Sequence, residues 1–243
     1  MDAHGIHSPF VFDFYNNVIK KSGEINDQAI QSLVKELSKN HHTIEVNDYG
    51  AGSKNAASRT RKISEITKSA AIPRKYGKLL ARMIQFYSLE TIVELGTSVG
   101  ISGLYLTQPL CVKKLVTVEG SAEIAALAKN NFAAFGLKQV ELITGKFDDH
   151  LEDTINKNSK PDLVFIDGNH QYKPTIDYFN FYIDRISENG FIVFDDIYWS
   201  DEMEKAWKDI CSSEKINVSM DLFRLGIVCK RPGQAKQHFV LKY

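Results

Sequence analysis

The sequence predicts an α/β fold: a doubly wound, mostly parallel sheet with helices on both faces. From Pro73 onward, short apolar runs alternate with segments whose apolar residues recur at helical spacing, as in parallel sheets with crossover helices. The first run enters a glycine-containing turn, Glu94-Leu-Gly-Thr-Ser-Val-Gly100, and the second ends at Glu119. Sheets of this kind bind ligands at the carboxyl ends of adjacent strands, so we expect a site there.

Residues 1–72 differ from the rest and predict a helical cap or extension. Segments 10–18 and 30–37 are expected to form short helices, and 44–53 a short strand followed by a glycine-containing turn. Their apolar content is too small for them to fold alone. We therefore expect residues 1–72 to cover the site of a domain spanning 73–243.

Seven strands and their intervening helices are expected in that domain. A proline begins the helix expected at 73–87, and the helix at 121–136 runs from a serine cap to a glycine stop. Residues 163–166 are apolar throughout, which is typical of a strand buried on both faces. The expected strands are 91–95, 114–118, 140–144, 163–166, 191–194, 216–220 and 225–230, of which the last two form a terminal antiparallel hairpin.

Composition and charge exclude several classes of protein. A hydrophobic content of 43 % and an aromatic content of 11 % suffice for a large core and argue against disorder. The three cysteines form neither a metal pattern nor a disulfide framework, and no apolar run is long enough to cross a membrane. The N-terminus lacks the features of a signal peptide. A cytoplasmic protein without a membrane partner is therefore expected.

The formal net charge of zero hides one basic stretch. Nine basic residues and one acidic residue lie between Ala51 and Arg82. Several of these charges fall at helical spacing and no aromatic residues interleave with them, which favours a solvated helix face over a nucleic-acid surface.

The glycine turn predicts a pocket for a nucleoside without phosphates. Gly96 and Gly100 are spaced Gly-x-x-x-Gly, which is not the G-x-G-x-x-G fingerprint of dinucleotide sites. Glycines let the backbone approach a ligand closely, and Glu119 is placed to bind both hydroxyls of a ribose. S-adenosylmethionine fits this description, and an NAD-dependent dehydrogenase is the less favoured alternative.

Three carboxylates are expected at two neighbouring strand ends. Asp167 follows the strand at 163–166, and Asp195 and Asp196 follow the strand at 191–194. A lone aspartate at a strand end is often a turn residue, but three converging carboxylates would raise one another's pKa unless a cation lay between them. Oxygen ligands of this kind suit Mg²⁺ or another hard divalent cation.

The loops that follow these carboxylates carry candidate catalytic and acceptor-binding residues. His170 could take a proton near neutral pH and is the candidate general base, with Lys173 as the second candidate. Tyr172, Tyr198 and Trp199 could line a slot for an aromatic acceptor, or pack at its rim.

Together these residues resemble a class I S-adenosylmethionine-dependent methyltransferase. Within that superfamily the chain is similar to metal-dependent O-methyltransferases of the catechol and caffeoyl-CoA type, and to sugar O-methyltransferases of antibiotic pathways. The resemblance covers about residues 75–230 and rests on 94–102, Glu119, 165–170 and 194–196. It implies the Rossmann-like methyltransferase fold.

The resemblance also implies roles for individual residues. Catechol-type enzymes have Asn where Asp196 stands and a Lys base where His170 stands. The implied cofactor set is Glu94, Gly96, Thr97, Gly100, Ser102, Glu119 and Asp167, with Phe147 stacking on adenine and Asp148 bonding it; the implied metal set is Asp167, Asp195 and Asp196, and the implied catalytic pair is His170 and Asp167.

The expected reaction is metal-assisted O-methylation of a small-molecule hydroxyl, phenolic or sugar. Ionising a phenol of pKa ~10 at pH 7 costs roughly 4 kcal/mol, whereas an aliphatic alcohol costs about 12 kcal/mol, which favours an acidified hydroxyl. Two alternatives stay open: a metal-independent methyltransferase acting on RNA or protein, and a non-catalytic S-adenosylmethionine-binding protein. A homodimer is also left open.

Overall fold

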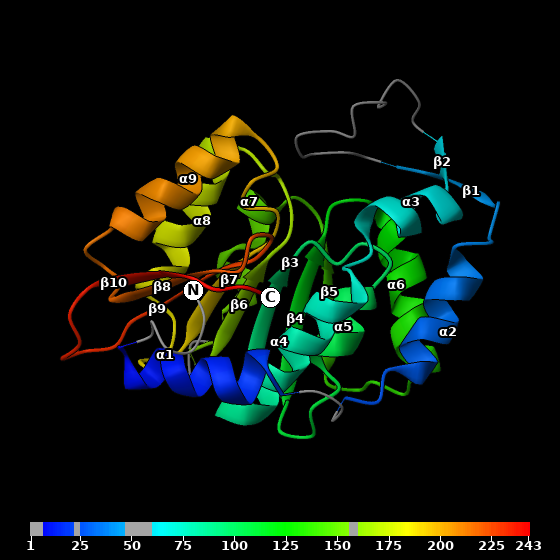
Figure 1. Ribbon diagram of the computed structural model, residues 1–243. Helices are drawn as coiled ribbons and strands as arrows, with labels where there is room; N and C mark the ends of the chain where they lie inside the picture. Colours follow the sequence, from blue (N-terminus) through cyan, green and yellow to red (C-terminus); the bar gives the residue numbers. More distant parts are fainter. Residues whose placement is uncertain (1–6, 22–24, 47–59, 156–159) are drawn as a thin grey trace.

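The computed structural model describes residues 7–21, 25–46, 60–155 and 160–243 (Figure 1). The expected turn at 47–53, and the basic residues Lys54 and Arg59, lie outside these ranges.

The described residues form an eight-stranded sheet in the order β10-β8-β9-β7-β6-β3-β4-β5 (Figure 1). Strands β3 to β7 are mutually parallel, β9 is antiparallel to β7 and β8, and β10 is parallel to β8. The expected α/β fold is confirmed. The strands are β3 (Thr91–Leu95), β4 (Lys114–Glu119), β5 (Val140–Thr144), β6 (Leu163–Ile166), β7 (Phe191–Phe194), β8 (Val218–Asp221), β9 (Gly226–Cys229) and β10 (Gln237–Val240).

Alternate residues of the central strands face two separate hydrophobic cores. Phe165 and Val193 belong to one core, whereas their neighbours Ile166 and Phe194 belong to the other. Because successive side chains of a strand point to opposite faces of the sheet, an all-apolar strand packs against helices on both faces. Helices α4 (Arg74–Tyr87), α5 (Ile101–Leu106) and α6 (Ala122–Ala134) cover one face, and α8 (Tyr172–Ile183) and α9 (Asp201–Ser212) cover the other (Figure 1).

The eighth strand, β10, was not expected from the sequence. Its burial pattern leaves Phe239 as the one buried residue of its four, and it lies at the edge of the sheet beyond β8. A short edge strand with a single buried side chain has too little apolar periodicity to be recognised. The prediction of seven strands was therefore one short.

The N-terminal elements pack against the main sheet. They are α1 (Pro9–Phe14), the π-helix η2 (Tyr15–Ile19), α2 (Gln28–Leu37), β1 (Thr43–Glu45), β2 (Thr60–Lys62) and α3 (Ile63–Ala70). The ring of Phe10 lies 6.2 Å from that of Phe191, which is the first residue of β7. Helix α1 therefore lies near the amino ends of the parallel strands, opposite the carboxyl ends where the site is expected. The Ser121 hydroxyl donates to the Glu45 carbonyl, which brings β1 next to α6. The division at residue 72 stays a prediction.

Part of the basic stretch does not lie on a helix. Arg61 and Lys62 belong to β2, which pairs with β1, so the expectation of helices over the whole stretch was wrong at these two positions. No helix in the described ranges is long and apolar enough to cross a membrane.

Candidate functional site

The loop after β3 packs directly against the end of β6. Gly96 has a φ of +107°, and a Cβ at this position would overlap the backbone carbonyl oxygen of Asp167. The Asp167 amide in turn donates to the carbonyl of Leu95 at 2.8 Å. Only glycine allows this approach, so Gly96 joins the predicted cofactor loop to the acidic residue of β6.

Glu119 anchors the other side of the same loop. Its Oε2 accepts from the backbone amide of Ser98 at 2.8 Å and its Oε1 from that of Ser121 at 2.9 Å. Ser98 has a φ of +48°, and its hydroxyl is buried without a hydrogen-bond partner among the described residues. A carboxylate oxygen accepts up to two hydrogen bonds, so this anchoring is compatible with a ribose at Glu119.

The polar side chains of β3 and its loop face the interior. Glu94 is 0 % exposed, and its Oε2 accepts from the Thr117 hydroxyl at 2.6 Å. The hydroxyls of Thr97 and Thr117 lie 2.5 Å apart, and Ser102 is also buried. Burial raises the pKa of Glu94 to about 7. These side chains support the loop from within the protein, and a direct cofactor contact by them stays a prediction.

The acidic residues of β6 and β7 are neighbours, as the sequence predicted. Ile166 pairs with Phe194 in the parallel ladder, so Asp167 and Asp195 leave the sheet side by side. A residue that was not predicted, Arg224, contacts this cluster: its Nε donates to Asp195 Oδ1 and its Nη2 to Oδ2, both at 2.7 Å.

Burial and mutual repulsion disfavour charge on these acids. The pKa of Asp167 is raised by burial first, then by Asp195 and Asp196, while Arg224 acts in the opposite direction. Burial, followed by Asp195, raises the pKa of Asp196 to about 6. The pKa of His170 is lowered, chiefly by burial, and its Nε2 lies 3.7 Å from Asp167 Oδ1. A neutral imidazole therefore stands beside the acidic cluster.

The carboxylates as arranged do not fit a divalent metal. Both oxygens of Asp195 accept from Arg224, and Oδ1 accepts from the Asp196 amide as well, at 2.9 Å. Within the described part of the chain, no group of three or more His, Cys, Asp or Glu side chains could hold a metal ion. The expected magnesium site has no support in this geometry.

The predicted adenine contact lies beside the same loops. A Cβ on Gly168 would lie 2.8 Å from the Phe147 ring, so this ring packs closely on the loop after β6. The Phe147 and Tyr178 rings are 6.0 Å apart, and Asn169 donates to the Tyr178 hydroxyl at 3.0 Å. Asp148 contributes to the raised pKa of Tyr178, after burial, and so lies near its hydroxyl.

Three exposed aromatic side chains lie in the loop after β7 and in the turn that carries Arg224. Trp199 is 58 % exposed with its ring 6.4 Å from that of His170, and the Tyr198 ring lies 6.0 Å from Phe223, which is 79 % exposed. Tyr172 and Lys173 are engaged elsewhere: the Tyr172 hydroxyl donates to Asp209, and Lys173 pairs with Asp177 on its own helix.

Residues 93–197 match the family described as "Methyltransferase domain". This segment of the chain is similar to that family. The resemblance to S-adenosylmethionine-dependent methyltransferases is thereby confirmed. Among curated proteins the chain is similar to a catechol O-methyltransferase of Niastella koreensis, with 32 % identity over 123 residues, 49 % of this chain and 54 % of that protein. The match thus spans about half the length of such relatives.

Solved structures share the fold of this chain. An O-methyltransferase of Bacillus cereus in complex with SAH gives a TM-score of 0.63 at 17 % identity, covering 91 % of this chain and 97 % of that one. The SAH-bound methyltransferase PaMTH1 of Podospora anserina gives 0.59 at 17 % identity, covering 87 % and 99 %.

Sequence reasoning missed Ser98, Phe223 and Arg224. The positive φ of Ser98 cannot be recognised from a serine. A signal for the other two existed, because they lie in the turn of the expected terminal hairpin. What the pattern did not show is that β9 pairs with β7, which brings this turn to the end of the sheet where the acidic residues lie.

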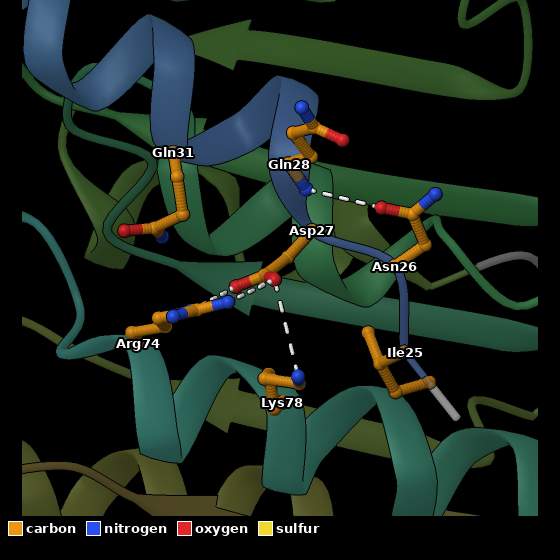
Figure 2. A pocket seen from close by; sticks show the side chains of 7 residues that line it. All are labelled: Ile25, Asn26, Asp27, Gln28, Gln31, Arg74 and Lys78. Carbon is orange, nitrogen blue, oxygen red and sulfur yellow. Dashed lines mark hydrogen bonds and ion pairs between the residues drawn. The ribbon is translucent and has the colours of Figure 1, made fainter. Parts of the chain in front are cut away.

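A polar cleft of about 570 Å³ lies away from the predicted site residues. Figure 2 shows Asp27 at its centre, with Arg74 donating to both carboxylate oxygens at 2.7 and 2.8 Å and Lys78 at 3.9 Å. The Tyr105 hydroxyl donates to the same carboxylate at 2.8 Å. Because the Asp27 carboxylate is hydrogen-bonded by Arg74 and Tyr105, we assign this cluster a structural role. The lining residues are Ile25, Asn26, Asp27, Gln28, Gln31, Arg74 and Lys78.

Proposed function

We propose that the protein is an S-adenosylmethionine-dependent O-methyltransferase that acts on a hydroxyl of a small molecule. The observation that carries this proposal is the position of Glu119, whose carboxylate accepts hydrogen bonds from the amides of Ser98 and Ser121. It lies beside the loop in which Gly96 packs against Asp167. An acid held at this place, next to a glycine loop without a phosphate-binding pattern, suits a ribose of a nucleoside cofactor.

The bound cofactor supplies an activated methyl group, and the chain must orient and deprotonate the acceptor hydroxyl. His170 is suited to accept that proton at a ring nitrogen, since burial keeps its imidazole neutral near pH 7. Asp167 Oδ1 lies 3.7 Å from Nε2 of His170, so the imidazolium that results would favour the ionised form of this carboxyl. No step of this mechanism uses a metal, because the acidic cluster does not fit one.

Aromatic surface at the cluster supports a small, flat acceptor. Tyr198, Trp199 and Phe223 expose 45 %, 58 % and 79 % of their surface. The Trp199 ring lies 6.4 Å from that of His170, and the Tyr198 and Phe223 rings lie 6.0 Å apart. Exposed rings that gather at one site bury substrate surface when it binds. Together with the cost of ionising an aliphatic alcohol, this favours a phenolic acceptor over a sugar.

Calorimetric titration with S-adenosylmethionine tests the cofactor. We expect saturable binding to the wild type and a loss of about tenfold or more in Glu119→Ala, because hydrogen bonds to a charged group are lost. The matched control is Glu141→Ala, an exposed glutamate on β5. Equal affinity in the two variants would contradict the assignment of Glu119.

A screen of catechols, flavonoids and sugars for release of S-adenosylhomocysteine tests the reaction. We expect release with at least one hydroxyl acceptor, and its strong reduction in His170→Gln with S-adenosylmethionine binding retained. Binding without release for any acceptor would identify a non-catalytic binding protein. Methylation of added RNA or protein instead would favour the macromolecular alternative.

A further inference from the structure

The turn between β8 and β9 places a cation at the acidic end of the sheet. Gly226 of β9 pairs with Phe194 of β7, so the turn lies over Asp195. The Ile197 amide donates to the Arg224 carbonyl at 3.2 Å, and the Phe223 amide donates to Asp221 Oδ1 at 2.7 Å. The turn is thus attached both to the loop after β7 and to the end of β8.

Arg224 binds the Asp195 carboxylate through two nitrogens of its guanidinium, Nε and Nη2. Two parallel hydrogen bonds of 2.7 Å form the bidentate arrangement that arginine makes best with a carboxylate. The Asp195 side chain is 0 % exposed and that of Arg224 is 29 % exposed. The same Nη2 lies 3.3 Å from Asp196 Oδ1, so one guanidinium forms ion pairs with two of the three clustered carboxylates.

This ion pair offsets the repulsion between the three clustered carboxylates. Carboxylates gathered at one place need a positive charge among them, and the sequence pattern suggested that a divalent metal supplies it. In the structure the charge comes from the chain itself. A buried carboxylate that lost its arginine would be left uncompensated, which is strongly unfavourable, so Arg224 keeps Asp195 from acting as a metal ligand.

We propose that Arg224 is the built-in cation of this site, takes the place of a divalent metal, and makes methyl transfer metal-independent. The catalytic role of Arg224 rests on the proposed function, whereas the metal-binding test described below does not depend on it. Arg224 is a positioning residue: it holds Asp195 and Asp196, and offsets their charge where an ionised acceptor oxygen would otherwise be repelled.

Metal titration of the purified full-length chain tests the proposal directly. Mn²⁺ alone is the probe, followed by electron paramagnetic resonance, with and without S-adenosylmethionine. We expect no saturable Mn²⁺ binding to the wild type. Arg224→Gln frees the carboxylates and should introduce saturable Mn²⁺ binding, and adding Asp195→Asn to Arg224→Gln should abolish it.

Two further variants distinguish the loss of the positive charge at residue 224 from a general effect on folding. Arg224→Lys retains a positive charge and should remain without Mn²⁺ binding, whereas Arg185→Gln, which removes an arginine paired with Glu152 on the surface, should behave as the wild type. Circular dichroism of each variant reports folding. If Arg224→Gln does not fold, the wild type and Arg224→Lys still decide the question.

Stoichiometric Mn²⁺ binding by the wild type that is lost in Asp195→Asn would overturn the proposal, as would a folded Arg224→Gln that gains no Mn²⁺. Neither result would bear on cofactor binding. Conversely, failure of the wild type to bind S-adenosylmethionine would overturn the proposed function while leaving the metal result intact.

Discussion

Glu94 shows how a single buried carboxyl can couple folding to pH. It has no exposed surface, and its Oε1 has no hydrogen-bond partner among the described residues. Burial raises its pKa from 4.5 to about 7. Between these values the folded chain retains a proton that the unfolded chain has released. The stability that protonated Glu94 provides is therefore fully present below about pH 4.5 and is lost as pH rises through about 7.

Replacing Glu94 with Gln should remove this dependence. The amide has the same shape and no charge to bury, so between pH 4.5 and 8 the wild type should lose roughly 3 kcal/mol more of its free energy of unfolding than Glu94→Gln does. Urea unfolding at several pH values measures the difference. Glu141→Gln, an exposed change on β5, is the control, and should follow the wild type. Identical profiles for wild type and Glu94→Gln would mean that Glu94 is ionised in the fold.

At the scale of elements, the loop after β3 depends on the space available at one position. Gly96→Ala combines a left-handed φ of +107° with overlap of the Asp167 carbonyl oxygen. Gly136, just after α6, also has a positive φ, +67°, but no atom of the described residues lies within 4 Å of where its Cβ would be. Gly136→Ala therefore incurs the conformational cost alone, roughly 1–2 kcal/mol.

We expect Gly96→Ala to be clearly less stable than Gly136→Ala and to lose most S-adenosylmethionine binding, because the loop must move away from β6. Thermal unfolding and calorimetric titration of the two variants measure these effects. Equal stability and equal affinity would show that the loop relaxes without cost and that its contact with Asp167 is not needed for the cofactor.

The sequence was informative wherever an element follows from local periodicity. The all-apolar segments at 163–166 and 191–194 predicted both strands and the meeting of Asp167 with Asp195, because parallel neighbours end at the same edge. Contacts that depend on distant pairing were not predictable. Arg224 reaches Asp195 only because β9 pairs with β7, and no local pattern shows which strand a hairpin joins.

At the scale of the whole molecule, Asp27 connects the N-terminal elements to the helices that cover the main sheet. It lies just before α2 and accepts from Arg74 on α4 and Tyr105 on α5. The hydrogen bond from Arg74 is the main reason that the pKa of Asp27 is lowered from 3.8 to about 2. A lowered carboxyl pKa contributes stability above the unfolded value, near pH 3.8, and that contribution is lost as pH falls through about 2.

Asp27→Asn should therefore destabilise the chain at pH 7 by roughly 1–3 kcal/mol, because charged hydrogen bonds to a buried carboxylate are lost. Its difference from the wild type should shrink as pH falls toward 2. Asp184→Asn is the matched control: it breaks an ion pair with Lys215 in which both side chains are about half exposed, so it should change stability little. Urea unfolding followed by circular dichroism measures both. If the N-terminal elements are integral to the fold, Asp27→Asn will shift one cooperative transition, whereas a separate early transition would mean that they unfold independently of the sheet.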